Sequence, residues 1–216
     1  MRIAGFDPGA RFGFAYFDLP EGVGFKCPSS FEEGDKSTWS WGCREGVDSR
    51  DVIISKLRMG AWDLSASKRE GPGMMWVRLE NYLAELSADF FVYELARGHW
   101  RSGDAEYYYN GGVAMLEAWA VRAGVKAYDS VHVGTLKKFA TGSGRCNKKD
   151  IVDAVNEQFS LDLRYYQDDE ADAAFLLKWA VTNYGETLGA TGVDSSAVQT
   201  LRSETEKSSS KKGKRK

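Results

Sequence analysis

The stretch Phe90–Leu95 (FFVYEL) is apolar without interruption until one acid near its end. A half-exposed strand alternates apolar and polar residues, whereas a strand buried on both faces reads as a continuous apolar run. The stretch therefore predicts a central buried strand. Strand-like and helical segments alternate around it, which is typical of an α/β fold.

Two strand-like segments open the chain. Arg2–Asp7 is a short apolar run that stops at Asp-Pro-Gly, and Phe12–Asp18 is rich in aromatic and small residues, so the two predict a hairpin. Residues 19–72 are rich in Gly, Ser and charged residues. We expect them to form an irregular insertion with one edge strand, for which Thr38–Gly42 is the strand-like piece.

Beyond residue 72 the apolar residues follow helical spacing in several segments. In order, the expected elements are a helix after Gly71–Gly73, the strand Phe90–Leu95, a polar loop at Gly103–Asn110, a helix at Gly111–Ala123, a strand at Gly124–Asp129, a helix at Val131–Ala140, and two helices capped by Asn147 and Asp168. This order predicts a mixed five-stranded sheet, with the hairpin as its antiparallel part, flanked by helices.

A hydrophobic fraction of 43% in 216 residues suits one domain. We place that domain at residues 1–185 and a flexible Ser/Lys-rich basic tail at 186–216, because apolar periodicity stops there. Residues 203–216 hold six basic and two acidic side chains, a charge of +4, so with a net charge of −2 the remainder carries −6. An acidic body with a basic arm fits carboxylates that bind cations.

Neither a signal peptide nor a membrane-spanning run stands out in the sequence, and we expect a cytoplasmic protein. The three cysteines, Cys27, Cys43 and Cys146, are scattered and form no CxxC pair, and the chain has only two histidines. This composition argues against a zinc site and for reduced thiols.

Four acids occupy the ends of expected elements. Asp7 and Glu94 end strands, and Asp169 and Asp172 lie three apart at the start of a helix, so we expect them to converge at the rim of the sheet. Crowded carboxylates raise each other's pKa and need a positive partner. Mg²⁺ accepts carboxylates together with phosphates, and a pair of such ions can drive an in-line displacement. Taken singly, Asp7 also fits a turn and Asp169 a helix N-terminus, where acids are favoured.

Four motifs that contain these acids resemble, in the same order, those of the RuvC-type Holliday junction resolvases of the RNase H-like superfamily. The motifs are IAGFDPGARFGFAYFD, FVYE, LKKFATGSGRCNKKDIV and DDEADAAFLL. The resemblance implies two Mg²⁺ ions, for which Mn²⁺ substitutes, held by Asp7, Glu94, Asp169 and Asp172. It implies Lys137 and Lys148 as catalytic or phosphate-contacting lysines. It also implies a homodimer that places two active sites on a four-way DNA junction, in recombination and repair.

Two departures from the family pattern indicate a divergent, phage-type member. Residues 19–72 are longer than in the bacterial housekeeping form, and Leu95 and Ala96 follow Glu94 where that family has an aromatic wedge shortly after the second acid. The motifs therefore support nuclease chemistry more strongly than they support specificity for four-way junctions.

Aromatic and basic side chains follow Glu94, and these can stack on unpaired bases and hold phosphates. The candidate DNA-binding residues are Arg97, Trp100, Arg101, Tyr107 and Tyr108, with Arg145 and Lys149 beside the glycine turn. The alternative is that the tyrosines pack under the following helix. Lys148 follows the turn, whose backbone N–H groups can meet a phosphate, although a solvated lysine is the alternative.

Three functions remain open at this point. The first is a junction-resolving endonuclease, the second a broader structure-selective or RNase H-like nuclease, and the third a catalytically inactive nucleic-acid scaffold. Intact acids at all four motif positions argue against the scaffold. For the homodimer we expect the Gly111–Ala123 helix to be buried, with Met115, Leu116 and Trp119 supplying apolar area.

Overall fold

The computed structural model describes residues 1–18, 57–65, 70, 73–96 and 102–191. Its elements are β1 (Arg2–Asp7), β2 (Arg11–Asp18), β3 (Arg58–Asp63), α2 (Met74–Leu86), β4 (Phe90–Leu95), α3 (Gly103–Ala123), β5 (Ala127–His132), α4 (Val133–Thr141), α5 (Lys148–Phe159) and α6 (Asp168–Thr191). This is the predicted order of strands and helices.

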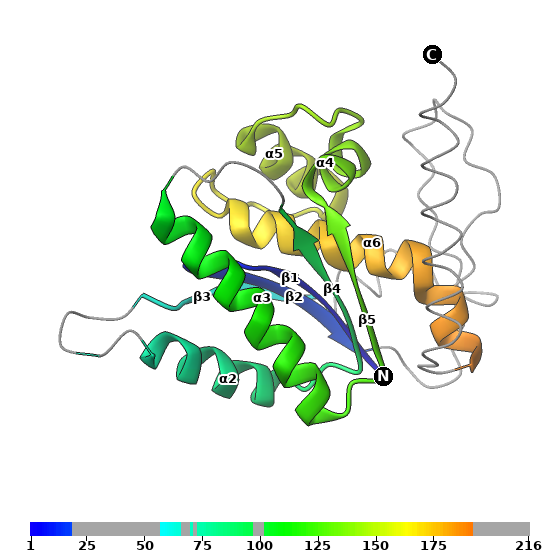
Figure 1. The fold of residues 1–216 in the computed structure, drawn as a ribbon. Helices are drawn as coiled ribbons and strands as arrows, with labels where there is room; N and C mark the ends of the chain where they lie inside the picture. The colour runs from blue at the N-terminus through cyan, green and yellow to red at the C-terminus, as the bar shows by residue number, and fades with distance from the viewer. Residues whose placement is uncertain (19–56, 66–69, 71–72, 97–101, 192–216) are drawn as a thin grey trace, which may run out of the picture.

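The strands form one mixed sheet in the order β3-β2-β1-β4-β5 (Figure 1). β1 pairs antiparallel with β2 and parallel with β4, and β4 pairs parallel with β5. The carboxyl ends of β1, β4 and β5 therefore meet at one edge of the sheet, and the start of β2 lies at the same edge. The predicted hairpin, the mixed sheet and the buried strand Phe90–Leu95 are confirmed.

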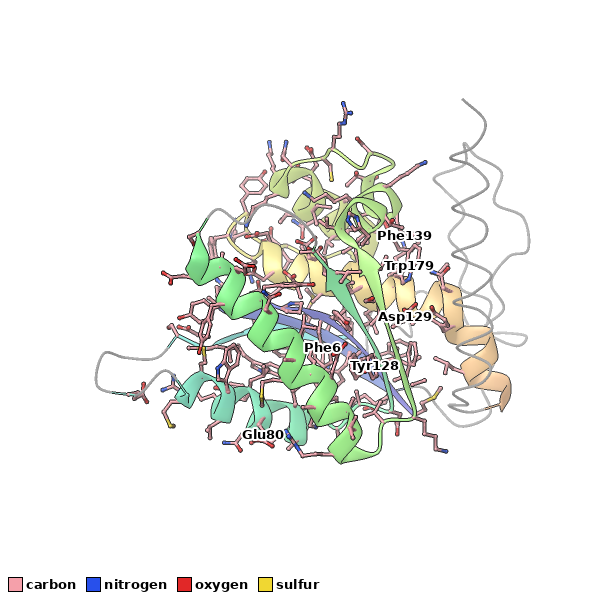
Figure 2. The ribbon with its side chains drawn as sticks, viewed as in Figure 1. Phe6, Glu80, Tyr128, Asp129, Phe139 and Trp179 are labelled. Carbon is pink, nitrogen blue, oxygen red and sulfur yellow. The ribbon has the colours of Figure 1, made fainter. Side chains whose placement is uncertain are left out.

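Helices cover both faces of the sheet (Figure 1). Because side chains alternate along a strand, Ile3 and Phe90 pack toward α4, α5 and α6, whereas Phe6 and Phe91 pack toward α2 and α3. The helices on the first face also contact one another: the rings of Phe139 in α4 and Trp179 in α6 meet edge to face at 5.2 Å (Figure 2). The sheet therefore carries a separate apolar core on each side.

Two glycines allow α6 to lie against the strands without intervening side chains. A Cβ on Gly5 would lie 2.5 Å from the carbonyl oxygen of Ala173, and one on Gly13 would lie 2.1 Å from that of Asp169. Both distances are far below contact distance, so any larger residue would push the helix away. The backbone of α6 thus runs directly over β1 and β2.

The edge strand expected within residues 19–72 exists, but at Arg58–Asp63. Its Trp62 stacks on Phe14 at 4.5 Å and on Tyr82 of α2 at 5.1 Å. Aromatic pairs across a ladder stabilise sheets, which explains why this segment pairs with β2. The strand-like piece Thr38–Gly42 lies outside the described residues.

The predicted loop at Gly103–Asn110 is wrong, because α3 already begins at Gly103. The side chain of Ser102 accepts a hydrogen bond from the Ala105 N–H at 3.2 Å and caps the helix. Asp104 and Glu106 in the first turn also favour the helix N-terminus. The polar composition of this segment reflects exposure of a helix, which is hard to distinguish from a loop.

The next two elements begin later than predicted. Gly124 ends α3 in the left-handed conformation (φ 70°), and the Val125 N–H bonds to the Ala120 carbonyl at 2.9 Å. This turn occupies the first part of the predicted strand, so β5 starts at Ala127. His132 then ends β5 and caps α4, accepting the Gly134 N–H on Nδ1 at 3.2 Å.

We expected the Gly111–Ala123 helix to supply a dimer surface, but its glycine at position 111 allows it to pack against α2 of the same chain. A Cβ on Gly111 would lie 2.3 Å from the Trp76 ring of α2, so this glycine allows α2 and α3 to pack. Leu116 and Trp119 are buried in the core on that face of the sheet, and Met115 packs against it. The prediction that these residues supply dimer area is therefore wrong for Leu116 and Trp119, and a homodimer stays a prediction.

The last helix extends past the predicted domain boundary at residue 185, since α6 continues to Thr191. The remaining tail residues lie outside the described part of the chain, so the predicted flexibility of the tail stays a prediction. Within the described ranges, no helix is long and apolar enough to span a membrane.

Candidate active site

Two of the predicted acids stand side by side at the carboxyl edge of the sheet. The last residue pair in the ladder between β1 and β4 is Phe6–Tyr93, and Asp7 and Glu94 each follow directly. In parallel strands, residues at the same register point to the same face. Asp7 and Glu94 therefore share the face that α6 covers.

The other two acids come from the first turns of α6. Gly13 pairs with Asp7 in the ladder between β1 and β2, and the Asp169 backbone lies directly over Gly13. This contact places the start of α6 beside the end of β1. Because Asp169 and Asp172 are three residues apart, their side chains project from neighbouring positions on one helix face.

Electrostatics show that the four carboxylates lie close together. Burial, and next the charges of Glu94 and Asp172, raise the pKa of Asp7 well above its usual range. Asp169 contributes to the same effect. Like charges have this influence only at short range, so the structure brings together the acids that the sequence singled out.

The remaining three acids are perturbed in the same direction. Burial raises the pKa of Glu94 to about 7, against the opposing charge of Lys137. Burial and then the charge of Glu94 raise the pKa of Asp172 to about 8. Burial and then the charge of Asp168 raise the pKa of Asp169 to about 6. Each carboxylate is thus costly to ionise unless a cation approaches it.

The donor set fits a hard divalent cation. Among the described residues, Asp172 Oδ1 is a buried oxygen without a hydrogen-bond partner. Buried polar atoms are ordinarily satisfied, so this oxygen is free to ligate an ion that prefers carboxylates. No three acid, histidine or cysteine side chains of the described chain are arranged as a preformed metal site.

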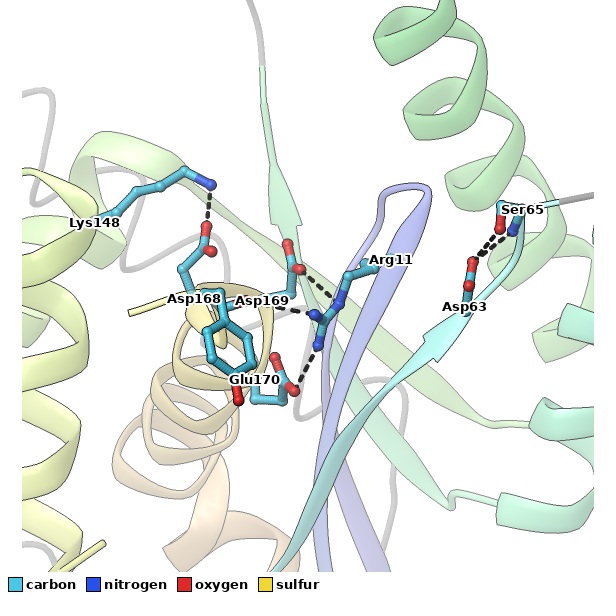
Figure 3. A network of polar contacts seen from close by, with 8 residues as sticks. Arg11, Asp63, Ser65, Lys148, Asp168, Asp169 and Glu170 are labelled. Carbon is cyan, nitrogen blue, oxygen red and sulfur yellow. Dashed lines mark hydrogen bonds and ion pairs between the residues drawn. The ribbon is translucent and has the colours of Figure 1, made fainter. Parts of the chain in front are cut away.

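Both predicted lysines lie at the cluster, in different ways. Lys148 is the first residue of α5, after the capping box that Asn147 forms with Asp150, and its Nζ donates to Asp168 Oδ2 (Figure 3). Burial lowers the pKa of Lys148, but the contact with Asp168 outweighs this and the net shift is upward, so the lysine stays cationic. The Lys137 charge acts on Glu94, and its Nζ lies 3.4 Å from the Cys146 carbonyl oxygen.

Arg11 and Glu170 belong to the site, although sequence reasoning missed them. Figure 3 shows Arg11 at the start of β2, reaching the first turn of α6: its Nη2 donates to Glu170 Oε1 at 2.7 Å, and its Nε lies 3.4 Å from Asp169 Oδ2. Glu170 Oε2 is a second buried oxygen without a partner among the described residues. Arg11 lies in the first motif, but nothing in the sequence links it to an acid 159 positions away.

Of the tyrosines after Glu94, one packs inside the protein and another is exposed enough to contact DNA. Tyr109 is buried, and its hydroxyl donates to the Glu94 carbonyl and accepts from the Ala96 N–H, both at 2.9 Å, so it fixes the end of β4. Tyr108 is partly buried against the core, and Tyr107 is half exposed.

The other predicted DNA-binding residues are spread over the molecule or fall outside the structure. Arg145 and Lys149 are exposed near Lys148, and the Lys149 Nζ lies 5.4 Å from the centroid of the Tyr165 ring. Arg97, Trp100 and Arg101 lie outside the described residues. DNA contact by any of these side chains stays a prediction.

Two solved structures that match this fold are structures of RuvC. A structure of Thermus thermophilus RuvC in complex with a Holliday junction substrate matches with a TM-score of 0.54 and 16% identity, over 88% of this chain and 97% of that chain. Another structure of Thermus thermophilus RuvC matches with a TM-score of 0.52 and 17% identity, over 87% and 95%. No protein-family model matches the sequence, and neither does any curated protein. The chain therefore has the RuvC fold, an RNase H-like fold, as its motifs predicted.

Proposed function

We propose that the protein is a metal-dependent endonuclease that cuts four-way DNA junctions by phosphodiester hydrolysis. The observation that carries this proposal is the convergence of four acids from β1, β4 and α6, with one buried oxygen of Asp172 left without a partner. A cluster of perturbed carboxylates at the carboxyl edge of a sheet favours a catalytic role over a structural one, because it destabilises the fold.

In this proposal Asp7, Glu94, Asp169 and Asp172 hold two Mg²⁺ ions, and Mn²⁺ can replace them. When bound, such ions lower the pKa of a water and stabilise the leaving oxygen of an in-line displacement. The four acids determine where the ions would bind, because Asp7 and Glu94 lie on adjacent strands and the two aspartates of α6 lie on the helix that covers these strands.

The lysines supply fixed positive charge. Lys148 is cationic and mostly exposed, with 73% of its side chain open to solvent, so it can reach a phosphate that lies over the acids. A cation at that place stabilises the charge that develops on the phosphate oxygens. Lys137 lies closer to Glu94 and Asp172 and balances part of their charge.

Support for the substrate comes from the fold. Thermus thermophilus RuvC, whose structure matches 88% of this chain and 97% of its own, has been solved in complex with a Holliday junction substrate. A branched substrate with two symmetric scissile strands calls for two active sites, and we propose a homodimer for that reason.

The alternative is a broader structure-selective nuclease. It is favoured by the end of β4, where Leu95 and Ala96 follow Glu94 and the Tyr109 hydroxyl pins the Ala96 N–H. A small residue held in this way cannot act as a wedge in a branch point.

A cleavage assay separates these functions. Full-length protein is incubated with Mg²⁺ and a four-way junction, a flap, a linear duplex or an RNA–DNA hybrid of matched sequence. Cutting confined to the junction supports the resolvase, and equal cutting of junction and flap supports the alternative. Absence of cutting on all four substrates, with Mg²⁺ and with Mn²⁺, refutes the nuclease proposal.

A further inference from the structure

A tight turn between α5 and α6 presents two consecutive tyrosines. In this tyrosine turn (Arg164–Gln167) the Gln167 N–H donates to the Arg164 carbonyl at 2.8 Å, and the Arg164 N–H donates to Gln167 Oε1 at 2.9 Å. Tyr165 and Tyr166 occupy the two corner positions. Two hydrogen bonds across four residues make the turn a fixed platform.

Both rings point away from the core. Tyr165 is 56% exposed and Tyr166 is 69% exposed, more than any other aromatic side chain in the described chain. Most of the protein's other aromatic residues there are buried or half buried. Adjacent exposed rings on a rigid turn are typical of a binding surface rather than of packing.

The turn adjoins the acids. The Arg11 guanidinium, which contacts Asp169 and Glu170, also donates from Nη1 to the Tyr166 carbonyl at 3.4 Å. Gln167, the last residue of the turn, accepts the Ala171 N–H of α6 at 3.1 Å. The same helix turn therefore carries the candidate metal ligand Asp169 and anchors the tyrosine turn.

Two cationic side chains, Lys149 and Arg164, adjoin the turn. The Lys149 Nζ lies 5.4 Å from the Tyr165 ring centroid, and Lys149 follows Lys148, the lysine that reaches Asp168. Arg164 begins the turn and is mostly exposed, with a long contact of 3.6 Å to Asp162. Aromatic rings set among cations suit a ligand that joins flat bases to phosphates, because each ring can stack while the cations meet the backbone.

We propose that the tyrosine turn stacks on unpaired nucleobases of the strand whose phosphate lies at the acid cluster. The inference deepens the proposed function and rests on it for the identity of the substrate. Bases in intact duplex are already stacked on each other, so the turn favours DNA with exposed bases, as at a branch point.

The test measures binding to single strands of equal length, one of thymidines and one of abasic spacers, with Ca²⁺ in place of Mg²⁺ and strand integrity checked afterwards. Both strands carry the same phosphates, so the ratio of their dissociation constants reports base contact alone. We compare wild-type protein with the double variants Tyr165→Ala/Tyr166→Ala and Tyr165→Phe/Tyr166→Phe. The Phe variant keeps the rings and is the matched control, and thermal unfolding confirms that all three fold.

Wild-type protein and the Phe variant should bind the thymidine strand about tenfold or more tightly than the abasic strand, the effect of stacking one base. The Ala variant should bind the two strands within about twofold of each other. The proposal is overturned if wild-type protein does not distinguish the strands, if the Ala variant still does, or if the Phe variant behaves like the Ala variant. It is also overturned if the only effect of the Ala substitutions is a loss of self-association or of binding to another protein.

Cutting of the four-way junction by the same proteins separates this inference from the proposed function. Wild-type protein that prefers thymidines but cuts nothing refutes the nuclease and leaves the stacking site standing. Wild-type protein that cuts the junction while the Ala variant retains its base preference does the reverse.

Discussion

Asp172 shows what the acid cluster costs at the scale of single residues. Its Oδ1 is buried and has no partner among the described residues, and the charge of Glu94 opposes its ionisation. A carboxylate in that position lowers the stability of the fold unless a cation binds. The residue is therefore explained by its chemistry and not by packing.

Stability of the metal-free protein should fall as the pH rises from about 4 to about 8. The folded-state pKa values of Asp169, Glu94 and Asp172 are about 6, 7 and 8, above the unfolded values of about 4. Within that window the folded state holds protons that the unfolded state has released, so the free energy of unfolding decreases with pH. Melting temperatures measured in EDTA across this range test the sign.

Two controls make the pH prediction specific. Mg²⁺ should restore stability at the alkaline end, and Asp172→Asn should make the metal-free curve shallower because it removes one raised pKa. A metal-free melting temperature that rises between about pH 5 and about pH 8 would contradict the account.

Lys148→Ala should slow single-turnover cleavage on the order of 10²-fold, as loss of a group that stabilises developing charge does elsewhere. The control is Lys126→Ala, an exposed lysine just before β5, at the opposite edge of the sheet from the acids. Lys148 does not stabilise the developing charge if Lys148→Ala slows cleavage less than about threefold, or no more than Lys126→Ala does.

At the scale of elements, glycines decide where the helix that carries two acids lies. Gly13→Ala places a Cβ 2.1 Å from the Asp169 carbonyl oxygen, so α6 must move. We expect a loss of roughly 1–3 kcal/mol in the free energy of unfolding and weaker Mn²⁺ binding, measured by denaturation and by titration calorimetry. Gly103→Ala, where a Cβ meets nothing within 4 Å, should leave both unchanged or stabilise the fold slightly.

The prediction for Gly13 links packing to the site. Mn²⁺ affinity equal to wild type in a folded Gly13→Ala protein would mean that the close approach of α6 does not position Asp169.

The sequence predicted the elements whose pattern is local. The apolar run Phe90–Leu95 and the Asn147 cap are confirmed because continuous burial and capping depend on neighbouring residues. The start of α3 was missed because exposed helix residues carry no apolar period. The edge strand could be predicted only as lying somewhere within residues 19–72, because the pairing of β3 depends on stacking of Trp62 on rings of β2 and α2, which are distant in sequence.

In the candidate site too, residues within local patterns could be predicted, whereas residues defined by contacts between distant segments could not. Asp7, Glu94, Asp169 and Asp172 could be predicted because each stands at the end of an element in a motif that resembles a known family. Arg11 could not, since its role depends on a contact between β2 and α6. The tyrosine turn could not either, because adjacent tyrosines read equally well as buried residues until their exposure is known.

At the scale of the whole molecule, the charge is divided between an acidic body and a basic tail at residues 203–216. Deleting these residues, which lie outside the described structure, should weaken binding to all DNA shapes alike. The excess charge of +4 allows up to about four phosphate contacts, at a log–log salt slope near −0.9 for each. Salt titrations of binding with and without the tail measure the change, and cleavage position should not move. An unchanged slope would make the tail irrelevant to DNA.

We propose that the four acids form a divalent-cation site that cuts branched DNA. The most direct test is single-turnover cleavage of a four-way junction in Mg²⁺ by wild-type protein and by Glu94→Gln, which keeps the side-chain shape and removes the charge. We predict that wild-type protein cuts the junction and that Glu94→Gln is slower by on the order of 10³-fold while binding it with similar affinity. Cleavage by Glu94→Gln at the wild-type rate would contradict the account.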